Sequence, residues 1–168
     1  MTVTLEQFRQ AMGHFATGVT IVTTQDDQGQ PYGLTVNSFT SVSLNPMLVL
    51  VCLDSSLSGL EAFKKSNKFA VNVLSEDQQD LSNYFAQSGT DRSQAAYIPG
   101  KTGIPLLEGV LATLECEIVK WYRGGDHAIM LGEVQQAETT QSDKKPLLFL
   151  QGRYTRIDTE VGTRIDTD

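Results

Sequence analysis

The stretch of residues 35–53 constrains the fold of this chain more than any other. Its second half, residues 47–53, is an unbroken run of seven apolar side chains that follows Asn45 and Pro46. A short apolar run after such a turn signal predicts a β-strand that is buried on both faces. The run is far shorter than the roughly 20 apolar residues that a membrane-spanning helix needs. We therefore expect residues 47–53 to form a core strand.

The first half of the same stretch, residues 35–43, is crowded with hydroxyl groups and carries one amide, that of Asn37. Small polar side chains let the backbone come close to a flat ligand and can hydrogen-bond its ring edges or phosphate oxygens. An edge strand rich in Thr and Ser that leads into the core strand would have the same composition. On these residues alone, the edge strand is the favoured interpretation and the ligand site is the alternative.

Periodicity divides most of the chain into strands, turns and a few helices. Residues 4–15 have apolar side chains at helical spacing, and Thr4 with Gln7 has the pattern of a capping box. The same pattern predicts helix starts at Ser58 and at Ser75, the latter helix ending near Gly89. Strands are expected at residues 19–24, 32–37, 68–74, 110–122, 127–138 and 147–154. This order predicts a mainly β fold, a closed or nearly closed antiparallel barrel with added helices.

Two segments carry further expectations. Along residues 110–122 apolar side chains alternate with Glu115 and Glu117, which predicts that both glutamates face away from the core. Residues 88–105 show no clean period and contain several Gly and Pro residues, which is typical of a functional lid or an intersubunit arm.

Composition excludes several classes of protein. The net charge is −7 and the pI is about 4.8, with no basic run, so neither nucleic acid nor an anionic membrane is an expected partner. Cys52 and Cys116 lie in apolar contexts without the spacing of a zinc site, so we expect small buried hydrophobes in a reducing compartment. The N-terminus lacks the features of a signal peptide, and a cytoplasmic protein is expected. No GxGxxG motif follows a strand, which disfavours a Rossmann cofactor site.

A helix that begins at Ser58 would offer free N–H groups and the positive end of its dipole directly after the core strand. Such a helix start binds anions, although an ordinary capped helix has the same sequence pattern.

Four stretches together resemble the flavin reductase-like family. They are residues 13–22, residues 35–52, Gly125-Asp126-His127 and Gly152-Arg153-Tyr154, and they occur in the family's order over nearly the whole chain. The family consists of FMN-binding split β-barrels and includes the small reductase components of two-component aromatic monooxygenases. The resemblance implies a split antiparallel β-barrel over residues 1–158, with residues 159–168 as a C-terminal tail.

The resemblance also implies a cofactor site. The flavin ring and ribityl chain would contact Thr35, Val36, Asn37 and Ser38, and the same wall would include Ser41, Cys52, Leu53 and Asp54. The phosphate would meet Ser55, Ser58 and Arg92, and Phe85 would cover one edge. The nicotinamide would lie against Gly125, Asp126 and the catalytic His127. Arg153 and Tyr154 would contact nicotinamide or a second subunit, with an ordinary strand end as an equal alternative. The family's aromatic residue after Arg92 is replaced here by Ser93, so no stacking is expected there.

The function that the resemblance implies is that of an NAD(P)H:flavin oxidoreductase. It would use FMN or FAD with NADH or NADPH, form a homodimer, and supply reduced flavin to a monooxygenase. No nucleophile, acid–base pair or metal is needed, because a bound flavin does its own redox work. Two alternatives stay open: a flavin-binding electron carrier that makes no use of His127, and a non-redox ligand-binding barrel related only by fold.

Overall fold

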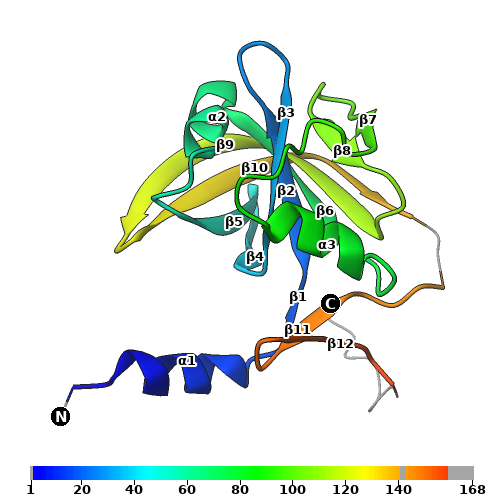
Figure 1. Cartoon of the computed structure of the whole chain (residues 1–168). Helices are drawn as coiled ribbons and strands as arrows, with labels where there is room; N and C mark the ends of the chain where they lie inside the picture. Colours follow the sequence, from blue (N-terminus) through cyan, green and yellow to red (C-terminus); the bar gives the residue numbers. More distant parts are fainter. Residues whose placement is uncertain (1, 141–142, 159–168) are drawn as a thin grey trace.

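The computed structural model describes residues 2–140 and 143–158, and its first element is the expected N-terminal helix. Helix α1 (Leu5–Gly13) follows Thr4, whose hydroxyl accepts a hydrogen bond from the Gln7 N–H at 3.2 Å. The Gln7 side chain accepts one from the Thr4 N–H at 3.0 Å, which completes the predicted capping box. No residue of α1 is buried, and Figure 1 shows the helix projecting away from the larger sheet.

Seven strands form one antiparallel sheet in the order β3-β2-β6-β9-β10-β5-β4. Their bounds are β2 Thr20–Gln25, β3 Pro31–Val36, β4 Phe39–Leu44, β5 Met47–Asp54, β6 Lys68–Val73, β9 Ala112–Gly124 and β10 His127–Thr139. The hairpins β2–β3 and β9–β10 confirm the expected pairs. Over the residues that the structure describes, the fold is therefore mainly β with three helices, as the sequence predicts.

The two ends of this sheet meet at Asn37 and Ser38. Strands β3 and β4 lie at opposite edges of the strand order, yet only these two residues join them. Since each residue spans at most about 3.6 Å, the sheet must curl until its edges come together. The ladders between the described strands do not close the ring, so the barrel is split at the point where the sequence is richest in hydroxyls.

Strand β5 is buried on one face, which corrects the expectation of burial on both. Val49, Val51 and Leu53 are buried, whereas the residues between them are only partly covered. The reason is that an antiparallel sheet can leave one face open, and β5 is the next-to-last strand at its edge. An unbroken apolar run does not distinguish the two cases.

The long hairpin β9–β10 also differs from expectation at one residue. Glu117 is exposed as predicted, but Glu115 is buried, with 3% of its surface exposed. Its carboxylate accepts hydrogen bonds from the backbone N–H groups of Lys101 and Thr102 at 2.9 and 2.7 Å. The turn before β8 (Pro105–Leu107) therefore covers the face of β9 that alternation assigned to solvent.

Both later helices begin after the predicted positions. Helix α2 (Leu60–Ser66) starts after Gly59 without any side-chain cap, so Ser58 is not a capping residue. Helix α3 (Gln79–Ala86) starts after Gln78, although the Gln78 side chain does accept a hydrogen bond from the Ser75 N–H at 3.0 Å. In the first case, a turn in which the Leu60 N–H donates to the Leu57 carbonyl replaces the capping box. The short α2 offers no anion site of its own.

The C-terminal region is a hairpin and not the single strand expected over residues 147–154. β11 (Leu148–Leu150) pairs with β12 (Arg153–Thr155), and β1 (Thr17–Gly18) completes a three-stranded sheet. Gln151 and Gly152 both have positive φ, which is the conformation of a tight hairpin turn. The irregular segment 88–105 contains β7 (Tyr97–Pro99), which pairs with β8. Residues 159–168, the predicted tail, lie outside the described residues.

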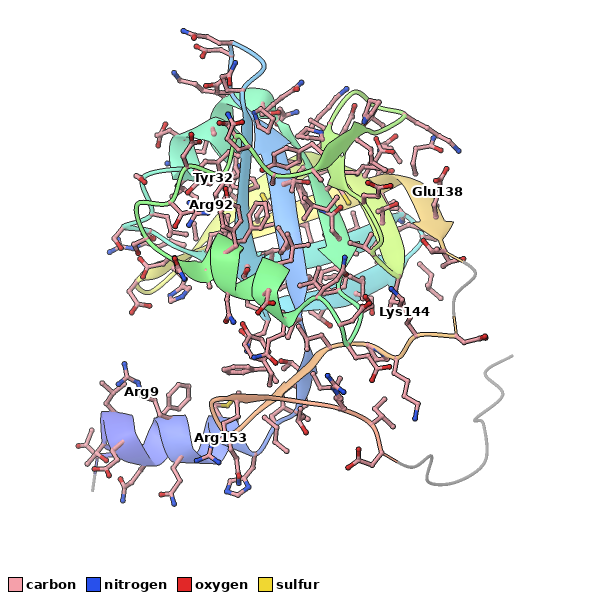
Figure 2. The ribbon with its side chains drawn as sticks, turned by 45° about the vertical axis from the view of Figure 1, so that its right-hand side comes forward. Arg9, Tyr32, Arg92, Glu138, Lys144 and Arg153 are labelled. Carbon is pink, nitrogen blue, oxygen red and sulfur yellow. The ribbon has the colours of Figure 1, made fainter. Side chains whose placement is uncertain are left out.

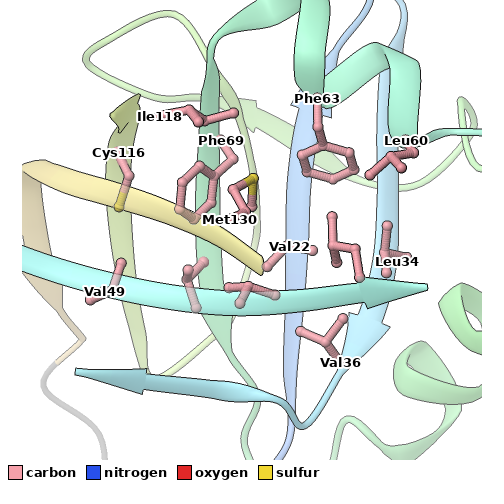
Figure 3. Packing of buried hydrophobic residues seen from close by; sticks show 13 residues of the cluster. Val22, Leu34, Val36, Val49, Leu60, Phe63, Phe69, Cys116, Ile118 and Met130 are labelled. Carbon is pink, nitrogen blue, oxygen red and sulfur yellow. The ribbon is translucent and has the colours of Figure 1, made fainter. Parts of the chain in front are cut away.

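The main hydrophobic core lies inside the curled sheet under α2. Figure 3 shows Phe63 of α2 and Phe69 of β6 beside Met130 of β10, all fully buried. A second cluster joins α3 to the small sheet through Phe85, Leu147 and Val19. Within the described residues, no helix is long and apolar enough to cross a membrane.

Candidate functional site

Two adjoining clefts follow β3 where it faces α3. The first has a volume of about 300 Å³ and the second about 190 Å³, and Thr35 and Ala86 line both. The first is also lined by Tyr32, Leu34, Ser56, Leu57, Ser58, Phe85, Ser88, Gly89 and Arg92. The second is also lined by Val19, Val36, Asn37, Phe149 and Tyr154. The clefts thus bring seven predicted site residues together in one surface, from Arg92 at one end to Tyr154 at the other, with Thr35, Val36, Asn37, Ser58 and Phe85 between.

Arg92 is the charged group of the first cleft. One Nη of its guanidinium donates to the Gln87 carbonyl, and the guanidinium carbon lies 5.8 Å from the centre of the Tyr32 ring (Figure 2). Its Nε is one of three buried side-chain nitrogen or oxygen atoms in the described part of the chain that have no hydrogen-bond partner. A buried donor without a partner destabilises the fold by roughly 1–3 kcal/mol. Arg92 also lines the first cleft, so its guanidinium places a positive charge beside an anionic ligand bound there.

Two glycines shape the wall beside Arg92. A Cβ on Gly59 would lie 1.7 Å from the Tyr32 ring, and one on Gly33 would lie 2.7 Å from Phe85. Both rings therefore occupy space that only glycine leaves free. Tyr32 also packs edge-on against Phe63 of the core, with ring centres 6.0 Å apart. The aromatic wall is therefore fixed to the barrel and does not depend on a ligand.

In the loop after β5, the hydroxyls of Ser56 and Ser58 differ in what they bind. The Asp54 carboxylate accepts hydrogen bonds from the Ser56 N–H at 2.8 Å and from the Ser56 hydroxyl at 2.7 Å. These bonds, the backbone one first, lower the pKa of Asp54. The Ser56 proton is thus already donated, whereas Ser58 lines the cleft. Ser58 and Arg92, with the hydroxyls of Tyr32 and Ser88, are therefore the side chains of this cleft that can donate to an anion there.

Residues Asn37 and Ser38, which join β3 to β4, form a seam between the two edges of the sheet. Ser38 binds this seam to β5. Its hydroxyl donates to the Cys52 carbonyl at 2.7 Å and accepts from the Cys52 N–H at 3.3 Å. The thiol of Cys52 takes no part in these bonds, and burial raises its pKa. Burial likewise raises the pKa of Cys116 to about 12. Both cysteines are free thiols, and a raised pKa keeps them protonated near neutral pH.

His127 lies at the end of β10, directly opposite Asp54 of β5 in the strand register. Its Nδ1 lies 2.8 Å from an Asp126 oxygen, and this hydrogen bond is the main reason for the lowered pKa of Asp126. The Asp126 carbonyl in turn accepts a hydrogen bond from the Ser55 N–H at 2.9 Å. One backbone bond therefore connects the Gly125–Asp126 turn to the loop that ends in the first cleft. Gly125 has φ +73°, which suits glycine.

Several predicted residues lie outside the clefts. Ser41 is exposed on edge strand β4, and Arg153 is exposed on β12. Leu53 is 1% exposed and packs in the core. Val36 lines the second cleft but is itself mostly buried.

Sequence reasoning missed Tyr32, Ala86 and Phe149 among the residues that line the clefts. The local sequence gave no signal for Tyr32, because the glycine that it lies against, Gly59, belongs to a different part of the chain. Ala86 and Phe149 gave none, since they belong to elements far apart in the sequence. The side chain of Ser82, described below, was missed for the same reason.

A larger hollow lies elsewhere. It measures about 730 Å³ and separates α1 from the turn at Gln151 and Gly152. Its lining includes Arg9 and His14, and Figure 2 shows Arg9 on the side of α1 that faces the rest of the chain. No group of metal-binding side chains was found among the described residues.

Comparison with known families and proteins agrees with this geometry. The family described as "Flavin reductase like domain" matches residues 12–158. A protein of Rhizobium meliloti (strain 1021) named a probable flavin reductase is 47% identical over 147 residues, which are 87% of this chain and 47% of that protein. The reductase subunit of a flavin-dependent monooxygenase from Mycobacterium tuberculosis is 37% identical over 158 residues, 93% of this chain and 84% of that protein. The chain spans about half the length of the first two curated relatives it matches.

Solved structures give the same result. The NADH:FAD oxidoreductase of Streptomyces globisporus C-1027, in complex with NAD and FAD fragments, matches with a TM-score of 0.87 and 37% identity. The match covers 96% of this chain and 99% of that one. The curled sheet, the seam at Asn37 and Ser38 and the family match over residues 12–158 together show that this chain belongs to the flavin reductase-like domain family.

Proposed function

We propose that this protein is an NAD(P)H:flavin oxidoreductase whose flavin lies in the two clefts beside β3. A bound flavin supplies the redox chemistry, since it accepts a hydride from reduced nicotinamide. The chain's own residues bind the cofactor and orient the nicotinamide. Relatives are named an FMN reductase that uses NADH and an NADH:FAD oxidoreductase, so we propose FMN or FAD with NADH or NADPH for this chain.

The position of the Arg92 guanidinium in the first cleft is the observation that carries the cofactor site. A guanidinium stays charged at any physiological pH and binds phosphate through charge-assisted hydrogen bonds. The guanidinium lines a cleft that continues past Thr35 to Asn37 and the seam. This arrangement supports a phosphate at Arg92 and Ser58 and a flat ring toward Asn37. It replaces the helix start at Ser58 as the anion site, because α2 has no capped start there.

His127 is assigned to the nicotinamide. Its Nδ1 is hydrogen-bonded to Asp126, which fixes the ring orientation and leaves Nε2 for a ligand. The backbone bond from Ser55 to Asp126 keeps this turn next to the cofactor cleft. We assign orientation of the reactant, and not proton transfer, to this imidazole.

A second copy of the chain is the proposed partner of α1. Leu5, Phe8 and Met12 on this helix, and Phe15 just after it, are 51–68% exposed, so this apolar stripe lacks a core to pack on. A contiguous exposed apolar surface of this kind marks an interaction site. The expected homodimer would cover it. Replacing Phe8 with Glu should then yield a monomer in sedimentation experiments, and an unchanged dimer would show that α1 is not the interface.

Two further expectations belong to the proposal. Relatives are named reductase components of flavin-dependent monooxygenases, which supports delivery of reduced flavin to such an oxygenase. The free, protonated thiols of Cys52 and Cys116 are compatible with the reducing cytoplasm in which we place the protein.

Consumption of NADH that depends on added FMN is the direct test. The full chain should oxidise NADH in proportion to FMN at low FMN concentrations, and Arg92→Ala should raise the FMN concentration needed for half-maximal rate. Arg156→Ala, which removes an exposed arginine outside both clefts, is the matched control. Binding of FMN without NADH consumption would show a flavin carrier, and absence of FMN binding would show a barrel that shares only the fold.

A further inference from the structure

A buried serine on α3 connects the two sides of the second cleft. Ser82 is fully buried, and its hydroxyl lies 2.8 Å from the hydroxyl of Tyr154 on β12. Its carbonyl accepts a hydrogen bond from the Thr35 hydroxyl at 2.7 Å. Thr35 and Tyr154 both line the second cleft, on opposite elements. One residue that does not line the cleft therefore fixes two residues that do.

The Ser82–Tyr154 bond is a side-chain link between α3 and the small sheet. The small sheet is also joined to the rest of the chain by the second apolar cluster and by nearby backbone bonds, such as the one from the Val19 N–H to the Leu147 carbonyl at 3.0 Å. Tyr154 also packs edge-on against Phe149, with ring centres 5.6 Å apart. The hydroxyl of Ser82 thus sets where this aromatic pair stands relative to Thr35.

Helix packing alone would not select a serine here. A serine inside a helix competes with the backbone for hydrogen bonds and is a weaker helix former than alanine. Its hydroxyl ordinarily bonds the carbonyl four residues earlier, yet at Ser82 it reaches a residue 72 positions away. A fully buried alanine would pack as well without that link.

We propose that Ser82 is a positioning residue for the flavin ring, acting through Tyr154 and Thr35. The inference rests on the proposed function, because it assigns the second cleft to the cofactor. Removing the hydroxyl would leave the Thr35 bond to the Ser82 carbonyl in place. It would release the Tyr154 ring, so the distance between Tyr154 and Thr35 across the cleft would no longer be fixed.

Two single variants and their combination test this role. Ser82→Ala and Tyr154→Phe each remove the same hydrogen bond from a different side. Each should weaken FMN binding by roughly two- to tenfold, as expected for one neutral hydrogen bond. The double variant should bind no more weakly than the weaker single, because the two changes remove one shared interaction. Both singles should also alter the visible difference spectrum of bound FMN in the same way.

Thr140→Val is the control for a structural hydroxyl. Thr140 donates to the Val110 carbonyl at 2.8 Å and lines neither cleft, so this variant should lose stability and keep FMN affinity. If Ser82→Ala and Tyr154→Phe behave like Thr140→Val while Arg92→Ala weakens FMN binding, Ser82 is merely structural and only this inference fails. Losses that multiply in the double variant would also contradict it. If the wild-type chain binds no FMN, the proposed function fails and the inference fails with it.

Discussion

Two groups of polar residues lie on opposite sides of the β2–β3 hairpin region and differ in how their hydrogen bonds are used. Around Asn72 every bond is internal: its amide donates to the Ile21 carbonyl at 3.0 Å and to Thr23 at 3.1 Å, and its carbonyl oxygen accepts from the Leu107 N–H at 2.9 Å. Around Arg92 the buried Nε has no hydrogen-bond partner among the described residues, and the side chain lines an open cleft.

The difference separates a structural role from a functional one. Asn72 and Thr23 are 0% exposed and join β6, β2 and β8 into one unit. A buried network of this kind stabilises a fold only when each member is satisfied. The cleft of Arg92 retains unused bonding capacity, which is what a ligand site requires. Changes to the first group should therefore alter stability, and changes to the second should alter binding.

The largest expected effect is on stability, at Asn72. Asn72→Ala would leave the Leu107 N–H and the Ile21 carbonyl without their buried partner, and should lower the free energy of unfolding by about 2–4 kcal/mol. Urea denaturation measures the loss. Asn83→Ala, on α3, removes an amide that makes no side-chain hydrogen bond with the described residues and should change stability little. If the folded Asn72→Ala protein loses FMN affinity as well as stability, the Asn72 group is not purely structural and the contrast with Arg92 fails.

The next effect is on catalysis, at His127. Misplacing a reactant by about an ångström reduces a rate on the order of a hundredfold. His127→Ala should therefore reduce the rate of bound-flavin reduction by NADH to that extent and leave the FMN dissociation constant near wild type. Stopped-flow reduction and flavin titration on one preparation give both values. If FMN affinity collapses while the reduction rate stays normal, His127 belongs to the flavin site. If neither value changes, His127 is a surface residue without a role in the site.

The smallest effect is expected at the thiols. Because burial raises the pKa of Cys52 and of Cys116, thiolate forms only as the pH rises toward those raised values. Alkylation at pH 8 should therefore be about tenfold or more slower in the native protein than in the urea-unfolded chain. Cys52→Ala should keep NADH-dependent flavin reduction within a few-fold. Lost turnover in a folded, flavin-loaded Cys52→Ala protein would reveal a thiol step.

Local patterns predicted much of this fold. The capping box at Thr4, the β2–β3 hairpin and the β9–β10 hairpin all follow from short-range signals, and the structure confirms them. The same capping pattern was wrong at Ser58, because Gly59 must lie against Tyr32 and the helix starts after it. Burial of Glu115 was also beyond local reasoning, since it depends on a turn at Lys101 and Thr102 that covers it.

The candidate site also contains residues that the sequence predicted and residues that it did not. Thr35, Asn37, Ser58 and Arg92 were expected from the resemblance, and the structure brings them into adjoining clefts. Tyr32 and Ser82 were not expected, because their relevance depends on which strand and helix they face. A sequence pattern gives the periodicity of an element but not its neighbours across the barrel.

Comparing FMN with riboflavin tests the central claim most directly, because the two ligands differ only in the phosphate. The wild-type chain should bind FMN more tightly than riboflavin by roughly ten- to hundredfold, the range for one charge-assisted contact. Arg92→Ala should reduce this preference to a few-fold at most while riboflavin affinity stays the same, and Arg156→Ala should preserve it. A preference for FMN that survives Arg92→Ala, with both affinities unchanged, would contradict the assignment of the phosphate to Arg92.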